Sequence, residues 1–255
     1  FMNMGFNLVS LATNHSLDYG EKGLVNSINY WGKQEGVIAA GSYESEESRV
    51  TPRIMEKNGI TYTLLSYSTL TNGLRIPTGK DYLFDLYSEE KVKADVERVR
   101  DKVDVVMVAM HWGAEYTHTP VQEEKTIAKY LASLGVDIVI GTHPHVIQPI
   151  DFIDNTMVIY SLGNFISAQI GIERLVGLAA SVTIKKSVVD GVSTITLENP
   201  AAELVYTRKA GATYGAGYKV YPFSKLDDTI LPGYQKYYEQ FMNIATKGSR
   251  EIIRK

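Results

Sequence analysis

The sequence predicts an α/β fold with mixed sheets, and three observations support this class. The chain has 255 residues, of which 44% are hydrophobic and 22% charged, as in ordinary globular domains. Its middle part alternates apolar, strand-like runs with helical patterns, which favours parallel strands joined by right-handed crossovers. After residue 141, short β-prone runs follow one another with brief connections, which indicates antiparallel pairing.

Apolar periodicity and turn residues define the elements of the N-terminal half. The expected elements are a strand at 7–12, a helix at 20–34, a strand at 37–40, and two further strands at 53–57 and 60–67. The helix presents Leu24, Ile28 and Trp31 on one face. Asn58-Gly59, between the last two strands, is the strongest hairpin signal in the sequence.

Capping residues define two helices in the middle of the chain. The expected elements are a helix from 88 to about 102, a strand at 103–110, a helix at 119–134 and a strand at 136–140. Ser88 is a typical N-cap residue and is followed by Glu89 and Glu90 in the first turn. Thr119-Pro120-Val121-Gln122 has the form of a capping box with proline at the first helical position.

The C-terminal part is predicted to be mostly β-structure. The expected elements are strands at 148–153, 157–160, 178–185, 193–197 and 203–207, and a helix at 233–246. We expect one domain over residues 1–210 and a C-terminal extension, residues 211–255, that packs on it.

Composition excludes several classes of protein. Lys and Arg number 26 and Asp and Glu 29, so the net charge of −3 argues against nucleic acid as the main partner. The absence of cysteine excludes disulfides and thiolate metal sites. The longest apolar runs, such as residues 103–110, are too short to span a bilayer.

The beginning of the chain differs from that of an ordinary domain. Phe1 is not an initiator methionine, and an apolar strand candidate starts only a few residues later. A domain rarely opens on a buried strand. We therefore expect a truncated chain that lacks one or more N-terminal strands and any targeting signal.

Four of the five histidines follow the end of a predicted buried strand: His15, His111, His143 and His145. Ligands bind at this edge of α/β sheets. Pro144 disfavours a helical conformation for His143, so the segment is expected to be extended, with both imidazoles on one side. Two converging imidazoles suit a borderline transition metal, although such a pair in a loop is often simply solvated.

The other candidates each have an ordinary structural alternative. A lone His111 is more often a buried structural histidine, and Asn14-His15 is often a turn or cap. His118 is most simply a solvated loop residue. Asp18 and Glu115 each lie four residues beyond a candidate ligand. Each is either a carboxylate that holds a ligating side chain in place or a surface charge.

Four motifs resemble those of the poly-gamma-glutamate capsule biosynthesis proteins, the CapA or PgsA family. Residues 11–20, LATNHSLDYG, resemble the family's A-N-N-H-S-L-D-Y-G. The other three matching segments are HWGAEY at 111–116, GTHPHV at 141–146 and YSLGNF at 160–165. The four occur in the family's order over roughly residues 8 to 166.

This family resembles the calcineurin-like metallophosphoesterases, which implies a layered α/β/β/α sandwich of mixed sheets with a two-metal site at one edge. The resemblance implies that Asn14, His111, His143 and His145 are metal ligands. It also implies that His15 is the catalytic acid beside the metals. We expect these five residues to share one pocket.

The resemblance implies a divalent transition metal, either Mn, Zn or Fe, with two ions in the intact protein. The superfamily also takes acidic ligands from strands before the Asn-His motif, and residues 1–13 contain no carboxylate. Two divalent ions about 3.5 to 4 Å apart repel each other unless anionic ligands bridge them. We expect the chain as given to bind one metal weakly or none.

Two functions are weighed from these features. The family implies a component of poly-gamma-glutamate capsule synthesis or export on the extracellular face of the bacterial membrane, with the polymer or other capsule synthesis subunits as partners. The alternative is an active two-metal phosphoesterase. A structural metal is a third possibility, although asparagine suits such a site poorly. Lys185-Lys186 and Arg208-Lys209 are candidates for contact with a polyanion.

Overall fold

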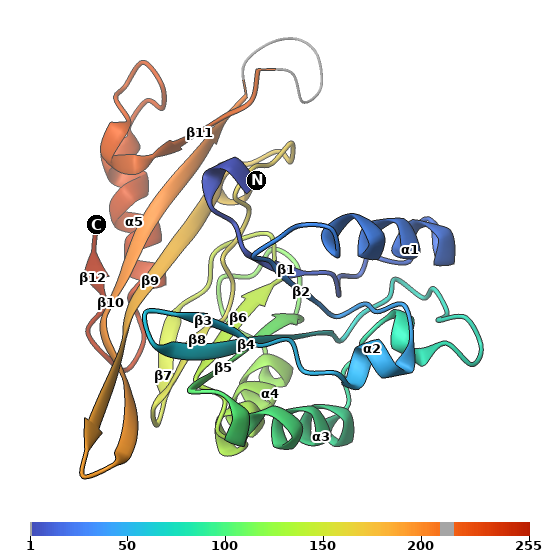
Figure 1. Ribbon diagram of the computed structural model, residues 1–255. Helices are drawn as coiled ribbons and strands as arrows, with labels where there is room; N and C mark the ends of the chain where they lie inside the picture. Colours follow the sequence, from blue (N-terminus) through green and yellow to red (C-terminus); the bar gives the residue numbers. More distant parts are fainter. Residues whose placement is uncertain (1, 210–216) are drawn as a thin grey trace. The chain divides into compact units, whose positions relative to one another are not determined.

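The computed structural model describes residues 2–209 and 217–255 (Figure 1). The chain forms two compact units. The first comprises residues 1–112 and 130–139, and the second comprises residues 113–129 and 140–255. The division falls inside helix α4 (Gln122–Ser133) and inside strand β6 (Ile138–Thr142).

The first unit combines short helices with two small groups of strands. Its helices are α1 (Gly20–Trp31), α2 (Glu46–Val50) and α3 (Glu89–Val99), and its 3₁₀ turns are η1 (Met2–Met4), η2 (Asp81–Leu83) and η3 (Arg100–Lys102). Its strands are β1 (Leu8–Ser10), β2 (Ile38–Ala40), β3 (Met55–Lys57), β4 (Ile60–Ser68) and β5 (Val105–His111).

Strand pairing in the first unit is mixed. β1 and β2 are parallel, β3 and β4 form the antiparallel hairpin predicted at Asn58-Gly59, and β4 and β5 are parallel. The register places Ser68 opposite His111 at the ends of β4 and β5. The parallel pairing expected in the middle of the chain is therefore confirmed for β4 and β5.

Helix packing in the first unit follows the predicted faces. Leu24 and Ile28 of α1 are buried in a small core. In α3, Val92, Val96 and Val99 are buried. The Ser88 hydroxyl accepts a hydrogen bond from the Lys91 N–H at 3.2 Å, so the predicted cap is confirmed.

The second unit is built mainly from antiparallel strands. Its elements are β7 (Ile150–Ile153), β8 (Thr156–Ile159), η4 (Ile172–Arg174), β9 (Val176–Val189), β10 (Val192–Arg208), β11 (Lys219–Pro222), η5 (Phe223–Lys225), α5 (Tyr234–Ala245) and β12 (Ile253–Arg254). β7 pairs with β8, and β10 pairs with β9 and β11, all antiparallel, while β10 and β12 are parallel. Figure 1 shows the long hairpin of β9 and β10 with α5 beside it. Phe241, Met242 and Ala245 of α5 are buried in the core of this unit.

The α/β class with mixed sheets is confirmed, and two element predictions are wrong. The predicted strands at 193–197 and 203–207 form one strand, β10, because a register shift between Glu198 and Ala201 absorbs the break in the pattern. Helix α4 begins at Gln122, so Pro120 is not its first residue. The Glu124 carboxylate accepts the Val121 N–H at 2.6 Å and replaces the expected cap from Thr119.

Two further observations concern the chain as a whole. The domain boundary expected at residue 210 stays a prediction, and residues 210–216 lie outside the described residues. Among the helices of residues 2–209 and 217–255, none is long and apolar enough to cross a membrane.

Candidate functional site

A hydrogen-bonded turn after β1 places Asn14 in the first unit. The Ser16 hydroxyl accepts the Thr13 N–H at 2.9 Å and donates to the Leu11 carbonyl at 2.6 Å. This turn holds the Asn14 side chain in a buried position. His111, the last residue of β5, is also buried.

The structure brings Asn14 and His111 together. Asn14 Oδ1 lies 2.9 Å from His111 Nε2. Asn14 Nδ2 donates to Asn72 Oδ1 at 3.1 Å, which assigns Oδ1 to the histidine side. Because an amide oxygen only accepts, His111 Nε2 carries the proton of this hydrogen bond. Asn72 lies in a loop of the first unit and was not among the predicted residues.

His15 lies in the same turn but points to solvent. Its side chain is 64% exposed, and its Nδ1 lies 2.8 Å from Asp18 Oδ2. Asp18 lies four residues after Asn14 in the sequence, but its carboxylate contacts His15. The pairing fixes the orientation of an exposed imidazole.

In the second unit, His143 and His145 follow β6 on a bent segment. The predicted extended conformation is wrong, because His143 has φ 100° and His145 has φ 60°. The strand ends at Thr142, and both histidines adopt the left-handed region that non-glycine residues rarely occupy. Their ring centroids are nevertheless only 6.2 Å apart. Such strained backbone clusters at functional sites.

Asn164 fixes the orientation of His145. Asn164 Nδ2 donates to the carbonyls of His145 and Arg174 at 3.2 and 3.0 Å, so its Oδ1 must face the His145 Nδ1, 3.0 Å away. An amide oxygen only accepts, so Nδ1 carries the proton and Nε2 keeps its lone pair. Nε2 lies 3.8 Å from the Glu115 carboxylate. Asn164 lies in the YSLGNF motif, although its role was not predicted.

Tyr116 covers the other side of His145. The two rings stack at 5.9 Å, and the Tyr116 N–H donates to the Pro144 carbonyl at 2.8 Å. The Arg174 guanidinium lies 4.0 Å from the centre of the Tyr116 ring. Desolvation, followed by the hydrogen bond to Glu115, raises the pKa of Tyr116 above 10.0. These contacts hold the HWGAEY and GTHPHV motifs together.

A shallow cavity of about 290 Å³ lies beside His145. It is lined by His145, Asn164, Ile166, Ser167, Ala168 and Gln169. The side chain of Ile166 is half exposed at its rim. The imidazole of His145 is therefore accessible to a small ligand.

In each unit, two donor atoms lie at a distance from each other at which both can bind one divalent metal ion. A metal–nitrogen bond is about 2.1 Å long, so a cation can lie between His145 Nε2 and Glu115 Oε1, 3.8 Å apart. The two ligands of one ion at neighbouring positions of an octahedron lie about 3 Å apart. The 2.9 Å between Asn14 Oδ1 and His111 Nε2 matches that separation, and a cation there would take the place of the proton that now joins the two atoms.

The donor sets are small in each case. Within the part of the chain that the structure describes, no group of three or more His, Asp or Glu side chains is arranged to hold a metal. The first unit brings together Asn14 and His111, and the second brings together His143, His145 and the more distant Glu115. One pocket shared by all five predicted residues stays a prediction.

Comparison with known proteins points to one family. Residues 1–169 match the family model described as "Bacterial capsule synthesis protein PGA_cap". The "PGA biosynthesis protein CapA" of Bacillus subtilis (strain 168) is 29% identical over 177 residues, which is 66% of this chain and 44% of that protein. The "Capsule biosynthesis protein CapA" of Bacillus anthracis is 29% identical over 169 residues, 65% of this chain and 41% of that protein.

The chain thus spans less than half the length of these two curated relatives. Among solved structures, it is similar to a hypothetical protein from Thermus thermophilus, with a TM-score of 0.45 and 19% sequence identity. That similarity covers 87% of this chain and 78% of the other.

Proposed function

Because the chain belongs to the bacterial capsule synthesis protein family, we propose that it acts in poly-gamma-glutamate capsule synthesis or export at the bacterial cell surface. The observation that carries this proposal is the match of the family model to residues 1–169, which contain all four motifs. Of the two Bacillus relatives, one is named for PGA biosynthesis and the other for capsule biosynthesis. Family membership supports the role in capsule biosynthesis, and the polymer, its export and the cell-surface location are the further parts of the proposal.

The proposed partners follow from that role. They are the poly-gamma-glutamate polymer and other subunits of the capsule synthesis machinery. The proposed location is the extracellular face of the bacterial membrane. The net charge of −3 gives no overall attraction for an anionic polymer, so its binding would depend on a local group of basic side chains.

We further propose that the strand-end donors bind a divalent transition metal, Mn, Zn or Fe. His143 and His145 would hold it in the second unit, and Asn14 and His111 in the first. Support comes from the Asn164 amide, which keeps the His145 Nε2 lone pair available beside Glu115. A bound metal would supply charge neutralisation at phosphoryl or carboxylate oxygens.

Active phosphoester hydrolysis is a second candidate, favoured by one observation. The exposed His15 imidazole is paired with Asp18 at 2.8 Å. A carboxylate partner holds an imidazole in one orientation, as a positioned proton-transfer group requires. In this candidate, His15 protonates the leaving alkoxide while Asn14, held by Asn72 and His111, stays fixed beside it.

Complementation tests the capsule role. A strain that lacks the gene is supplied with the full-length protein, with His143→Ala/His145→Ala, or with Asp190→Asn as control. Asp190 is an exposed turn residue with φ 50°, which asparagine tolerates equally well. We expect the wild type and the control to restore surface poly-gamma-glutamate and the double variant to restore little. Failure of the wild type would contradict the capsule role, and full restoration by the double variant would contradict the metal role.

Hydrolysis of an activated phosphoester tests the second candidate. If His15 is the acid, His15→Ala lowers kcat by about 10² to 10⁴ in the full-length protein. A wild-type protein that hydrolyses no phosphoester, with its metal content verified, excludes this candidate and leaves the capsule role untouched.

A further inference from the structure

We propose that a cavity in the second unit, lined by Lys125, Lys129 and Lys247, binds a chain of carboxylates. The cavity has a volume of about 550 Å³, within the range of sites that hold small-molecule ligands. Neither His143 nor His145 lines it. The site is therefore distinct from the histidine donors described above.

Three elements carry the cavity lysines and walls. Lys125 and Lys129 are four residues apart on α4, so their side chains lie on one face of that helix. Lys247 lies two residues beyond the end of α5, and its N–H donates to the Ile244 carbonyl at 3.3 Å. The hairpin of β7 and β8 adds Asp151 and Ile153.

In the described part of the chain, the three lysines form no ion pair, although Lys125 interacts electrostatically with its neighbour Glu124. Like charges four residues apart destabilise a helix, so Lys125 and Lys129 weaken α4 unless an anion lies between them. Within the described residues, none of the three ammonium groups is among the lysines that form an ion pair, such as Lys80, Lys91, Lys93 and Lys185. Unpaired lysines on a concave surface attract an anion.

The one carboxylate lining the cavity is already engaged. Asp151 Oδ1 accepts the Phe152 N–H at 2.8 Å and the Ser249 N–H at 2.7 Å. These donors compensate part of its negative charge. Three ammonium groups against one compensated carboxylate leave the cavity positive.

The walls between the lysines indicate what kind of anion fits. Pro149, Ile153 and Ile244 supply apolar surface, while Tyr160 and Asn243 add polar groups. An inorganic anion would leave the apolar surface unused. A chain whose carboxylates are separated by methylene groups uses both kinds of wall. These residues support a ligand with several carboxylates. That this ligand is a glutamate polymer rests on the proposed function.

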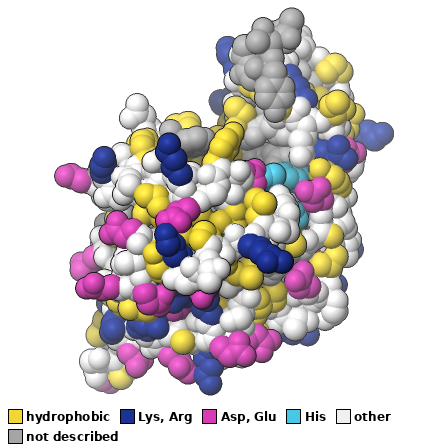
Figure 2. All heavy atoms as spheres, turned by 90° about the vertical axis from the view of Figure 1, so that its right-hand side faces the viewer, with side chains coloured by type: hydrophobic (Ala, Val, Ile, Leu, Met, Phe, Trp, Pro, Cys, Tyr) yellow, Lys and Arg dark blue, Asp and Glu magenta, His cyan; other side chains and the backbone are white. Residues whose placement is uncertain are grey.

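The two basic pairs that the sequence alone suggested, Lys185-Lys186 and Arg208-Lys209, are less suited to this role. Lys185 is paired with Glu198 at 3.0 Å, and Lys209 donates to the carbonyls of Ala168 and Gln169 at 2.7 and 2.5 Å. On the face drawn in Figure 2, basic and acidic side chains of the described residues are intermixed. A local group of lysines is therefore the better recognition element for a polyanion.

Calorimetric titration tests the proposal. A short oligomer of γ-linked glutamate is added at low salt to the full-length protein and to Lys125→Gln/Lys129→Gln/Lys247→Gln. The control variant, Lys219→Gln/Lys225→Gln/Lys236→Gln, removes the same charge from exposed positions of the same unit. We expect the cavity variant to bind at least about tenfold more weakly and the control to change less than about threefold.

Three results would overturn the proposal. They are no binding by the wild type, equal weakening in both variants, and tighter binding of inorganic phosphate or citrate than of the oligomer. The titration needs neither a metal nor a capsule. A protein that restores the capsule but binds no oligomer would therefore refute this inference and leave the proposed function standing.

Discussion

At the scale of single residues, amide side chains decide the geometry of the candidate site. The positions of Asn14 and the four strand-end histidines could be predicted, because strand ends and motif letters are visible in the sequence. The roles of Asn72 and Asn164 could not, because each depends on a contact between segments that are far apart along the chain. Asn164 lies 19 positions after His145 in the sequence, and only the fold brings them together.

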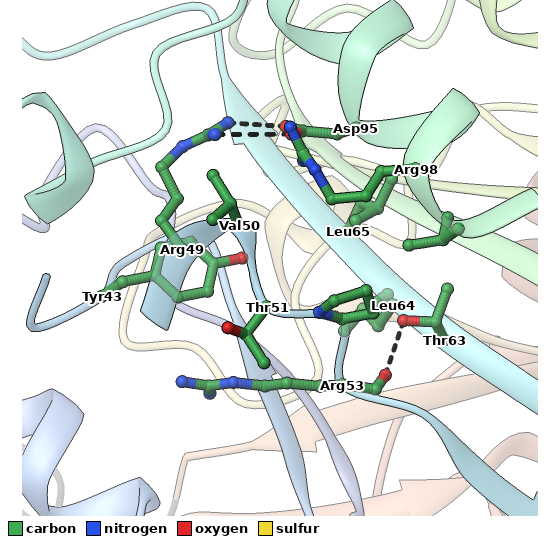
Figure 3. A pocket seen from close by; sticks show the side chains of 12 residues that line it. Tyr43, Arg49, Val50, Thr51, Arg53, Thr63, Leu64, Leu65, Asp95 and Arg98 are labelled. Atoms are coloured by element: carbon green, nitrogen blue, oxygen red, sulfur yellow. Dashed lines mark hydrogen bonds and ion pairs between the residues drawn. The ribbon is translucent and has the colours of Figure 1, made fainter. Parts of the chain in front are cut away.

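A buried ion network in the first unit gives a residue-scale prediction about stability. Figure 3 shows Arg49 directed at Asp95, and their atoms approach to 2.6 Å. Arg49 also contacts Asp85 at 2.7 Å, and all three side chains are at most 8% exposed. We expect Arg49→Met to lower the free energy of unfolding by about 3 to 5 kcal/mol, because Asp85 and Asp95 lose the one buried cation that they share and keep only the more exposed Lys91 and Arg98.

Chemical denaturation measures this loss, and Arg98→Met is the matched control. Arg98 contacts the same Asp95 at 2.5 Å, but its side chain is 31% exposed. Its loss should cost far less. Equal destabilisation by the two variants would show that burial is not what makes Arg49 important.

Glu124 gives a residue-scale prediction about pH. Burial raises the pKa of its carboxyl from 4.5 to about 7, against the smaller lowering effects of hydrogen bonds with Val121 and Gln148. A pKa raised by folding stabilises the protein fully below pH 4.5, and this contribution is lost as the pH rises through about 7. The effect is of the order of 3 kcal/mol. Glu124→Gln should therefore flatten the fall in unfolding free energy between pH 5 and 8.

Denaturation curves at several pH values check this expectation. Glu123→Gln, at an exposed neighbour on the same helix, should change the pH profile far less, because the Coulomb effect of Glu123 on Glu124 is one of the smaller causes of the raised pKa. If the Glu124→Gln and wild-type profiles are parallel over this interval, the buried carboxyl does not titrate there.

At the scale of elements, the hairpin of β3 and β4 shows how turn chemistry fixes local structure. Asn58 and Gly59 have φ 55° and 76°, as a two-residue turn with left-handed residues requires. A side chain at Gly59 would meet open space, so its cost is conformational only. We expect Gly59→Ala to lower the free energy of unfolding by about 1 to 2 kcal/mol.

Gly59→Asn is the control for this hairpin, because asparagine tolerates the left-handed region. Thermal unfolding should rank the wild type above Gly59→Asn and Gly59→Asn above Gly59→Ala. A reversed order of the two variants would mean that the positive φ at position 59 is not the reason why this turn needs glycine.

Elements with clear periodicity could be predicted, and those that depend on competing local effects could not. Helices α1, α3 and α5 and the strands of the hairpin match the apolar pattern, and α3 also has its predicted N-cap, Ser88. The pattern failed where a bulge continued β10 through Pro200 and where Glu124 capped α4. It failed again at His143, because the strand ended at Thr142 and the preference that proline imposes on the preceding residue was overridden.

At the scale of the whole molecule, each of the two units carries part of the predicted donor set. The first holds Asn14 in contact with His111, and the second holds His143 and His145. All four lie within the region that the family model matches, residues 1–169. Of the cavity lysines, only Lys247 lies beyond that region.

The central claim is that these strand-end donors bind a transition metal, and elemental analysis of the purified full-length protein tests it most directly. We predict Mn, Zn or Fe at about one to two equivalents per polypeptide in the wild type and a loss of most of it in His143→Ala/His145→Ala. A wild-type protein without these metals, or an equal metal content in the variant, would contradict the account.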